Sequence, residues 1–259
     1  MSGWTVRRHR RPDAAASLFC FAHAGGSPGE YVRWADDLPD VQVWGVHLPG
    51  RTTRHAEPPF TRVGPLVDAL VTEVRFDADG PFALFGHSLG AVLAFETARE
   101  LCRRGLRAPG RLIVSSCPPP PMPPSVAALR PLSDEALLGE LERLGGRSLD
   151  HLRDDPGLLA DALGGLRADL ALLDSYAPAP GPRLTCPVTA VAGTREPTAG
   201  TLAGWSRQTT GPTAVRLVPG GHFYFREDRT AAMGVVRESV LTPAPARPDE
   251  TKGGPEWNG

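Results

Sequence analysis

The stretch Phe82-Ala83-Leu84-Phe85-Gly86-His87-Ser88-Leu89-Gly90-Ala91-Val92 decides the fold of this 259-residue chain. Its first four residues are apolar and predict a buried strand, whereas the pattern over residues 91–104 predicts a helix. Between them lies Gly-x-Ser-x-Gly, the sharp strand-to-helix turn that exposes a serine as a nucleophile. Such a turn presses backbone against backbone where a Cβ atom would clash, so it needs glycine. The stretch therefore predicts that Ser88 is a nucleophile at the edge of a sheet.

The composition limits the classes of function. A chain of this length with 41% hydrophobic residues can form one large α/β domain or two small ones. The formal net charge of −1 gives no reason to expect nucleic acid as a main partner. No apolar run reaches the ~18 residues of a membrane span. The four cysteines lie far apart without a Cys-x-x-Cys pair, so the sequence predicts neither a metal nor a redox site. We expect a cytoplasmic monomer without cofactor or metal, with reduced cysteines at Cys20, Cys102, Cys117 and Cys186.

Strands and helices alternate along most of the chain. An arginine-rich start followed by an apolar run superficially resembles a signal peptide, but the run leads into a Gly-rich loop and predicts a first core strand. The alternation predicts βαβ units, and hence a mostly parallel central sheet with helices on both faces. We expect strands at residues 18–22, 41–48, 81–87, 111–117, 187–193 and 213–218. We expect helices at residues 30–38, 63–76, 91–104 and 226–241.

The alternation breaks at about residues 118–182. A proline-rich connector at 118–124 is followed only by helical patterns, at 136–144 and at 156–176, the second with a potential break at Gly164-Gly165. A helical insertion between strands of a hydrolase-type sheet indicates a lid over the site rather than a separate domain. We therefore expect one domain over residues 1–242. The tail at 243–259 is rich in Pro, Gly and charge, and predicts disorder.

A serine hydroxyl needs a general base, and the base needs a carboxylate that fixes its tautomer. In α/β-hydrolases the chain order is serine, acid, histidine, and only two histidines follow Ser88. His151 lies in the predicted lid beside charged residues, and we interpret it as a solvated helix residue. His222 lies in a Gly-Gly turn after the last strand, at the edge where a parallel sheet places its site. The sequence thus predicts His222 as the base.

The acid is expected in the loop after the preceding strand. Gly193-Thr194-Arg195-Glu196-Pro197 offers one carboxylate there, that of Glu196. The alternative is that Glu196 is a solvated surface charge beside Arg195. The loop after Cys117 offers no acid, and Asp228 is better explained as a dipole-complementing residue in the first turn of the last helix.

The tetrahedral intermediate of acyl transfer needs two backbone donors. One is expected to be the N–H of Leu89, the residue after the nucleophile, and the other comes from the loop after the first strand. In that loop we choose the N–H of Ala24. We interpret His23 as a loop anchor and His87 as the variable residue of the elbow.

Five motifs follow one another over nearly the whole chain. They are Phe-Ala-His-Ala-Gly-Gly at 21–26, Leu-Pro-Gly-Arg at 48–51, Gly-His-Ser-Leu-Gly at 86–90, Gly-x-x-Glu-Pro at 193–197 and Gly-Gly-His-Phe-Tyr-Phe at 220–225. Together they resemble the type II thioesterases, stand-alone α/β-hydrolases that accompany polyketide synthases and nonribosomal peptide synthetases. Leu-Arg-Ala-Asp-Leu at 166–170, with Asp-Ser-Tyr at 174–176, also resembles the end of that family's lid. The resemblance implies hydrolysis of acyl groups from the phosphopantetheine arm of acyl or peptidyl carrier proteins, which frees stalled synthases.

One position departs from the family pattern. Type II thioesterases usually have Asp where this chain has Glu196. The longer side chain can be accommodated, because Ser-His-Glu triads exist on this fold. It can also leave the contact with His222 poorly aligned. Glu196 therefore leaves open a weakly active or non-catalytic carrier-binding protein. A second alternative, independent of Glu196, is a small-ester or lactone hydrolase of the same fold.

Overall fold

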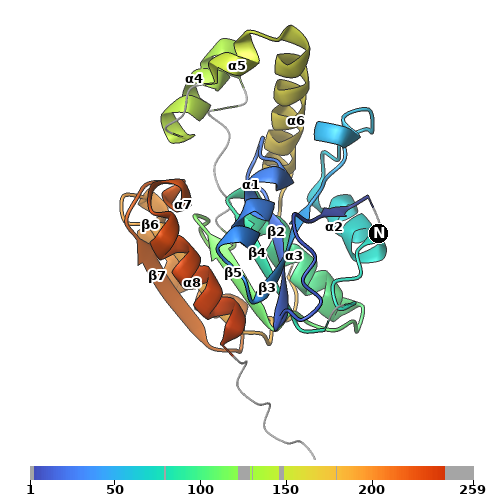
Figure 1. Ribbon diagram of the computed structural model, residues 1–259, viewed down its shortest axis with the longest axis vertical. Coiled ribbons are helices and arrows are strands. Elements are labelled where there is room, and N and C mark those ends of the chain that lie inside the picture. The colour runs from blue at the N-terminus through green and yellow to red at the C-terminus, as the bar shows by residue number, and fades with distance from the viewer. Residues whose placement is uncertain are drawn as a thin grey trace, which may run out of the picture.

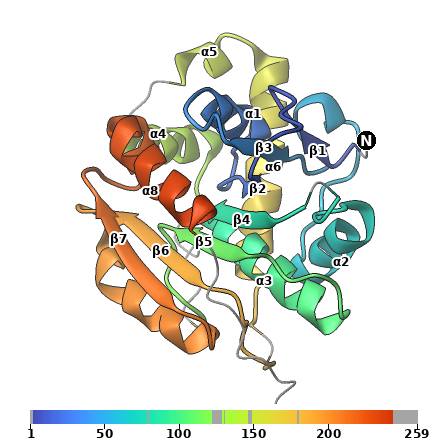
Figure 2. The same cartoon turned by 60° about the horizontal axis from the view of Figure 1, so that its bottom comes forward.

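The computed structural model describes residues 3–78, 80–121, 129, 131–145, 149–178 and 180–242. The predicted tail at 243–259, the end of the proline-rich connector and the side chain of His151 lie outside the described residues. The described residues form a seven-stranded sheet in the order β1-β3-β2-β4-β5-β6-β7 (Figure 2). Its strands are β1 (Thr5–Val6), β2 (Ala16–Phe21), β3 (Val41–Val46), β4 (Phe82–His87), β5 (Arg111–Ser115), β6 (Val188–Gly193) and β7 (Thr213–Val218).

The predicted mostly parallel sheet is confirmed. Strands β2 to β7 pair in parallel, each beside its neighbour in the order above. The two-residue strand β1 was not predicted, because it lies in a polar lead-in without alternation. It pairs antiparallel with β3, with Thr5 opposite Val46.

The helices lie where the sequence predicts them, but several differ from the prediction in length or are divided in two. The expected helix at 30–38 is divided into a short α-helix and a 3₁₀ turn, and the closing helix is divided at Asp228. Asp228 Oδ1 accepts the Ala231 N–H at 3.0 Å, so this residue caps the last helix. None of the described helices is long and apolar enough to cross a membrane. The helical elements are α1 (Pro28–Val32), η1 (Arg33–Asp36), η2 (Thr52–Arg54), α2 (Val63–Glu73), α3 (Leu89–Arg103), α4 (Asp134–Gly145), α5 (Asp150–Arg153), α6 (Pro156–Asp174), η3 (Pro197–Gln208), α7 (Tyr224–Glu227) and α8 (Arg229–Leu241).

Helices cover both faces of the sheet (Figures 1 and 2). Successive side chains of β4 point to opposite faces of the sheet and belong to different apolar clusters. Phe82 and Leu84 belong to the apolar cluster that includes α2, α3 and η3, while Ala83 and Phe85 join the cluster of α1, η1, α7 and α8. Burial of both faces explains why the strand is apolar throughout rather than alternating with polar residues.

Three helices, α4, α5 and α6, stand between β5 and β6 in the chain and lie beyond one end of the sheet (Figure 1). We call them the lid helices. Helix α6 is continuous through Gly164-Gly165, where a break was considered. Leu163, Leu166, Leu170 and Leu173 recur on one side of it and are buried in the cluster of α2 and α3. This burial offsets the roughly 1 kcal/mol that each helical glycine costs relative to alanine.

Candidate active site

The elbow at Ser88 has the strained geometry that its sequence predicts. Ser88 has φ 54° and ψ −117°, and the first turn of α3 follows it directly. A Cβ atom on Gly86 would lie 2.0 Å from the carbonyl oxygen of Gly90, and one on Gly90 would lie 2.0 Å from that of Phe21. Only glycine fits at either position. The turn leaves Ser88 half-buried at the end of β4, next to the positive end of the 15-residue helix α3.

His222 and Glu196 meet at the same edge of the sheet. His222 Nδ1 lies 3.0 Å from Glu196 Oε2, so the predicted acid and the predicted base share a hydrogen bond. The Glu196 side chain is 9% exposed and that of His222 is 20% exposed. A carboxylate at Nδ1 selects the tautomer with its proton on Nδ1, which leaves Nε2 as the free basic nitrogen. The extra methylene of Glu196 therefore does not prevent the contact.

The loops that carry these two side chains pack closely against each other. A Cβ atom on Gly193 would lie 2.2 Å from the Gly221 carbonyl oxygen, so glycine is required where β6 ends. The Arg195 N–H also donates to the Gly220 carbonyl oxygen at 2.9 Å. Main-chain contacts thus fix the acid loop against the base turn.

Glu227 in α7 adds a side-chain link between the same two loops. Its Oε1 accepts the Gly221 N–H at 2.7 Å, and its Oε2 pairs with the Arg195 guanidinium. The Gly221 N–H and then Arg195 hold the pKa of the Glu227 carboxyl below its ordinary value. No sequence pattern singled this residue out, because it is an exposed Glu in a predicted helix.

His87 is more than the variable residue of the elbow. Its ring is fully buried with its centroid 4.8 Å from that of His222, and its Nδ1 lies 2.8 Å from Ser115 Oγ. Ser115 Oγ also lies 2.8 Å from the Tyr224 hydroxyl. Burial, and then the positive charge of protonated His222, lower the pKa of His87 well below 6.5. A neutral ring therefore packs against the predicted base.

The loop after β2 holds the other predicted donor. The Gly26 N–H donates to the His23 carbonyl oxygen at 2.9 Å, and His23 Nδ1 lies 2.9 Å from the Tyr31 hydroxyl. These bonds agree with the interpretation of His23 as a loop anchor, and burial lowers its pKa to about 3. Within the described residues, the N–H groups of Ala24 and Leu89 donate to no protein acceptor. Ala24 also lines the cavity beside this loop, whereas Leu89 is fully buried.

A cavity of about 610 Å³ lies between this loop and the lid helices. Its walls include residues 23–26 of the loop and the leucines Leu138, Leu141, Leu163 and Leu166 of the lid helices. Glu30, Arg33 and Arg226 also line this cavity, whereas Ser88, Glu196 and His222 do not. Among the described residues, no group of three His, Cys, Asp or Glu side chains is placed to hold a metal ion.

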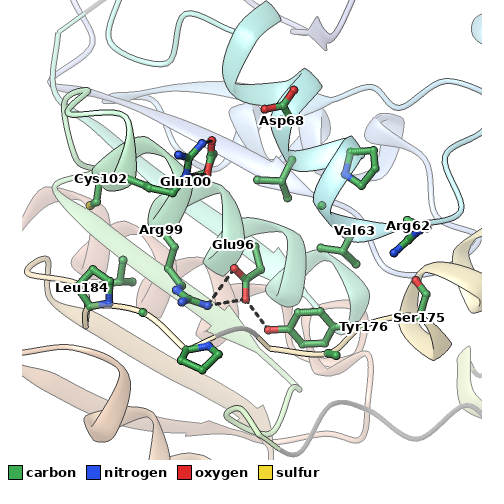
Figure 3. A pocket seen from close by; sticks show the side chains of 18 of the residues that line it. Arg62, Val63, Asp68, Glu96, Arg99, Glu100, Cys102, Ser175, Tyr176 and Leu184 are labelled. Atoms are coloured by element: carbon green, nitrogen blue, oxygen red, sulfur yellow. Dashed lines mark hydrogen bonds and ion pairs between the residues drawn. The ribbon is translucent and has the colours of Figure 1, made fainter.

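A second cavity, of about 530 Å³, lies between α2, α3 and the segment after α6 (Figure 3). Glu96 points into it, accepts the Tyr176 hydroxyl at 2.7 Å and pairs with Arg99 at 3.1 Å. Neither Ser88, Glu196 nor His222 lines this cavity.

Known proteins resemble this chain in sequence and in fold. A family model described as a thioesterase domain matches residues 16–239. Thioesterase PikA5 of Streptomyces venezuelae is 40% identical over 228 residues, covering 86% of this chain and 80% of PikA5. Gramicidin S biosynthesis protein GrsT of Aneurinibacillus migulanus is 31% identical over 229 residues, covering 87% of this chain and 89% of GrsT. The structure of the type II thioesterase BorB from the borrelidin biosynthetic cluster superposes with a TM-score of 0.80 at 36% identity, covering 92% of this chain and 97% of BorB. These matches confirm the predicted α/β-hydrolase fold and the resemblance carried by the five motifs.

Proposed function

The chain belongs to the thioesterase family, and we propose that Ser88, His222 and Glu196 form its catalytic triad. The 3.0 Å contact between His222 Nδ1 and Glu196 Oε2, at the edge of the sheet where the Ser88 elbow ends, carries this proposal. The family acts on thioesters, and the three residue types in this order provide nucleophile, base and acid.

In the proposed reaction, Ser88 Oγ attacks the thioester carbonyl carbon while His222 Nε2 accepts the hydroxyl proton. The carbonyl oxygen becomes an oxyanion, which accepts hydrogen bonds from the N–H groups of Ala24 and Leu89. Collapse breaks the carbon–sulfur bond, and the proton on His222 passes to the leaving thiolate. Water, activated by the same histidine, then hydrolyses the Ser88 ester. Each step uses side chains and backbone of this chain, and none requires a cofactor or a metal.

We propose that the substrates are acyl groups on the phosphopantetheine arm of acyl or peptidyl carrier proteins, and that their removal edits stalled polyketide or nonribosomal peptide synthases. The relative GrsT is named as a gramicidin S biosynthesis protein, and BorB as a type II thioesterase from the borrelidin biosynthetic cluster, which supports a role in such biosynthesis. The cavity between the loop after β2 and the lid helices, whose walls include Ala24 and several leucines, would take the acyl chain. We further propose that the protein acts in the cytoplasm, as a monomer, with carrier proteins as its partners.

The remaining alternatives differ in what they require of the site. A non-catalytic carrier-binding protein was suggested by Glu196, but the hydrogen bond to His222 counts against a misaligned acid. A small-ester or lactone hydrolase uses the same triad and differs only in substrate.

Intact-protein mass spectrometry with short-chain acyl carrier proteins, acyl-pantetheine thioesters and the matching oxygen esters separates these functions. We expect the wild type to turn over the thioesters faster than the esters, and the Ser88→Ala variant to show neither an acyl adduct nor hydrolysis. Preference for the oxygen esters would support the ester hydrolase instead. No adduct and no turnover with any substrate would leave only a binding function.

A further inference from the structure

A carboxylate from the lid helices lies directly behind the loop that holds Ala24. Asp169, in α6, is fully buried, and its Oδ2 accepts the Gly25 N–H at 2.8 Å. Arg51 approaches the same carboxylate from the loop after β3, with Nη2 2.5 Å from Oδ1 and Nη1 2.9 Å from Oδ2. Three segments that are distant in the sequence thus converge on one side chain.

The chemistry of this network is that of a buried, two-point ion pair. The Arg51 side chain is 11% exposed, so little water screens its interaction with Asp169. A guanidinium that binds both carboxylate oxygens fixes direction as well as distance. A buried ion pair is by itself weak evidence for stability, because desolvation consumes most of the attraction. Arg51 Nε is also buried without a partner among the described residues, so the pair is not optimised for stability alone. We therefore examine how this network fixes the conformation of the loop after β2.

The geometry concerns the orientation of successive peptide groups. Gly25 has φ +72°, and a Cβ atom there would lie 3.2 Å from Leu166 Cδ1, so the loop is pressed against α6. The Gly25 N–H is directed at Asp169 and the Gly26 N–H at the His23 carbonyl oxygen. The peptide between Ala24 and Gly25 is thereby fixed, and the preceding N–H, that of Ala24, keeps no protein acceptor.

We propose that Asp169 and Arg51 are positioning residues that hold the Ala24 N–H in place as an oxyanion donor. Because Asp169 belongs to α6, the lid helices contribute to catalysis as well as to the acyl cavity. Any opening of the lid that keeps the site competent must then leave this part of α6 on the loop. The inference rests on the proposed function, since it assumes that Ala24 binds the oxyanion.

The first test is Asp169→Asn, which keeps the shape of the side chain but removes its charge and places an amide donor against two other donors. The matched control is Asp134→Asn, which breaks the pair between α6 Arg167 and α4 Asp134 away from the loop. With an acyl-pantetheine thioester, we expect kcat of Asp169→Asn to fall about 10²-fold, because a displaced donor approaches the effect of a deleted one. KM should change less than about threefold, and the control should stay within about twofold of wild type. A folded Asp169→Asn protein with wild-type kcat would overturn the inference.

A double variant, Arg51→Met with Asp169→Leu, separates geometry from stability. It removes both charges, so no uncompensated ion remains buried and the thermal midpoint should recover relative to Asp169→Asn. Leucine offers the Gly25 N–H no acceptor, so kcat should be low in this variant as well. Recovery of kcat together with the thermal midpoint would assign the pair a purely structural role and overturn the inference.

Inhibitor binding gives a readout that loss of stability does not move. An acyl trifluoromethyl ketone forms a tetrahedral adduct with a catalytic serine, whereas the matching thioether occupies the site without an oxyanion. We expect the ketone to bind the double variant about 10²-fold more weakly and the thioether to bind it as it binds wild type. Equal weakening of both would overturn the inference. Absence of turnover by the wild type would instead overturn the proposed function, and this inference with it.

Discussion

The proposed site has an oxyanion half, formed by the loop with Ala24, and an acid–base half, formed by Glu196 and His222. One carboxylate supports each half in the same way, but one of the two is buried and the other is exposed. Asp169 accepts the N–H of Gly25, next to the proposed oxyanion donor, and Glu227 accepts the N–H of Gly221, next to the proposed base. Each also pairs with an arginine. The side chain of Asp169 is 0% exposed, whereas that of Glu227 is 45% exposed.

Burial decides how much each carboxylate can matter. If Glu227 is lost, water can take its place at the Gly221 N–H, and exposed ion pairs contribute only about 0–1 kcal/mol. If Asp169 is lost, the Gly25 N–H loses its acceptor and Arg51, whose side chain is 11% exposed, loses a fully buried countercharge that water screens little. The acid–base half has a second means of support, because Gly193 and the Arg195 N–H hold its loops together through the main chain. The two halves should therefore respond very differently to equivalent substitutions.

The largest loss of activity is expected from substitution of Glu196, the proposed catalytic acid. Glu196→Gln keeps the size of the side chain but removes the charge that stabilises protonated His222 and fixes its tautomer. We expect kcat to fall about 10⁴-fold, as for other triads that lose their carboxylate. Steady-state hydrolysis of an acyl-pantetheine thioester measures this. Glu196→Asp, which retains the charge, should retain clearly more activity, and equal rates for Gln and wild type would remove Glu196 from the triad.

The comparison of the two supporting carboxylates is tested most directly by stability. Asp169→Asn breaks a buried pair and leaves Arg51 without a countercharge, which should lower the free energy of unfolding by about 3–5 kcal/mol. Glu227→Gln should lower it by less than about 1 kcal/mol. Urea denaturation at pH 7 followed by circular dichroism gives both values. Similar losses for the two variants would mean that burial does not separate them.

The lowered pKa of His87 should have a smaller effect, on how the free energy of unfolding depends on pH. Burial keeps this pKa well below 6.5 in the folded protein, whereas the unfolded chain titrates near 6.5. Below pH 6.5 the unfolded state thus binds more protons, so the free energy of unfolding must decrease as the pH falls. The contribution approaches about 1.4 kcal/mol per pH unit between pH 6 and 5, until the folded-state pKa is reached.

Substitution isolates this contribution from other histidines, because His23 and His47 also have lowered pKa values. His87→Asn keeps a polar atom near Ser115 but cannot titrate. Its free energy of unfolding should fall less steeply between pH 6 and 5 than that of wild type, by about the same 1.4 kcal/mol per pH unit. If the free energy of unfolding depends on pH equally in both proteins, His87 takes up a proton in the folded state as readily as in the unfolded state, and its pKa is not lowered.

The contacts of His87 are among the features that the sequence alone does not predict. The positions of the main strands, their parallel pairing, the glycines of the elbow and the pairing of Glu196 with His222 follow from local patterns, because strand, turn and chain order constrain them. The contact between the His87 and His222 rings depends on where two distant loops meet. The role of Asp169 is of the same kind. Its motif resembled the family's lid, but only the packing of α6 on the loop brings its carboxylate to Gly25.

The smallest effect is expected from Glu227, whose link between the two loops repeats what the main chain already does. Glu227→Gln should reduce kcat by no more than about fivefold, because water and the Gly193 contacts keep His222 near Glu196. The pair with Arg195 is exposed, so high salt should weaken it and bring the wild type closer to the variant. Hydrolysis rates of both proteins at 0.05 and 1 M NaCl measure this convergence. A loss near 10²-fold that persists at both salt concentrations would place Glu227 beside Asp169, and burial would then not be what distinguishes the two halves of the site.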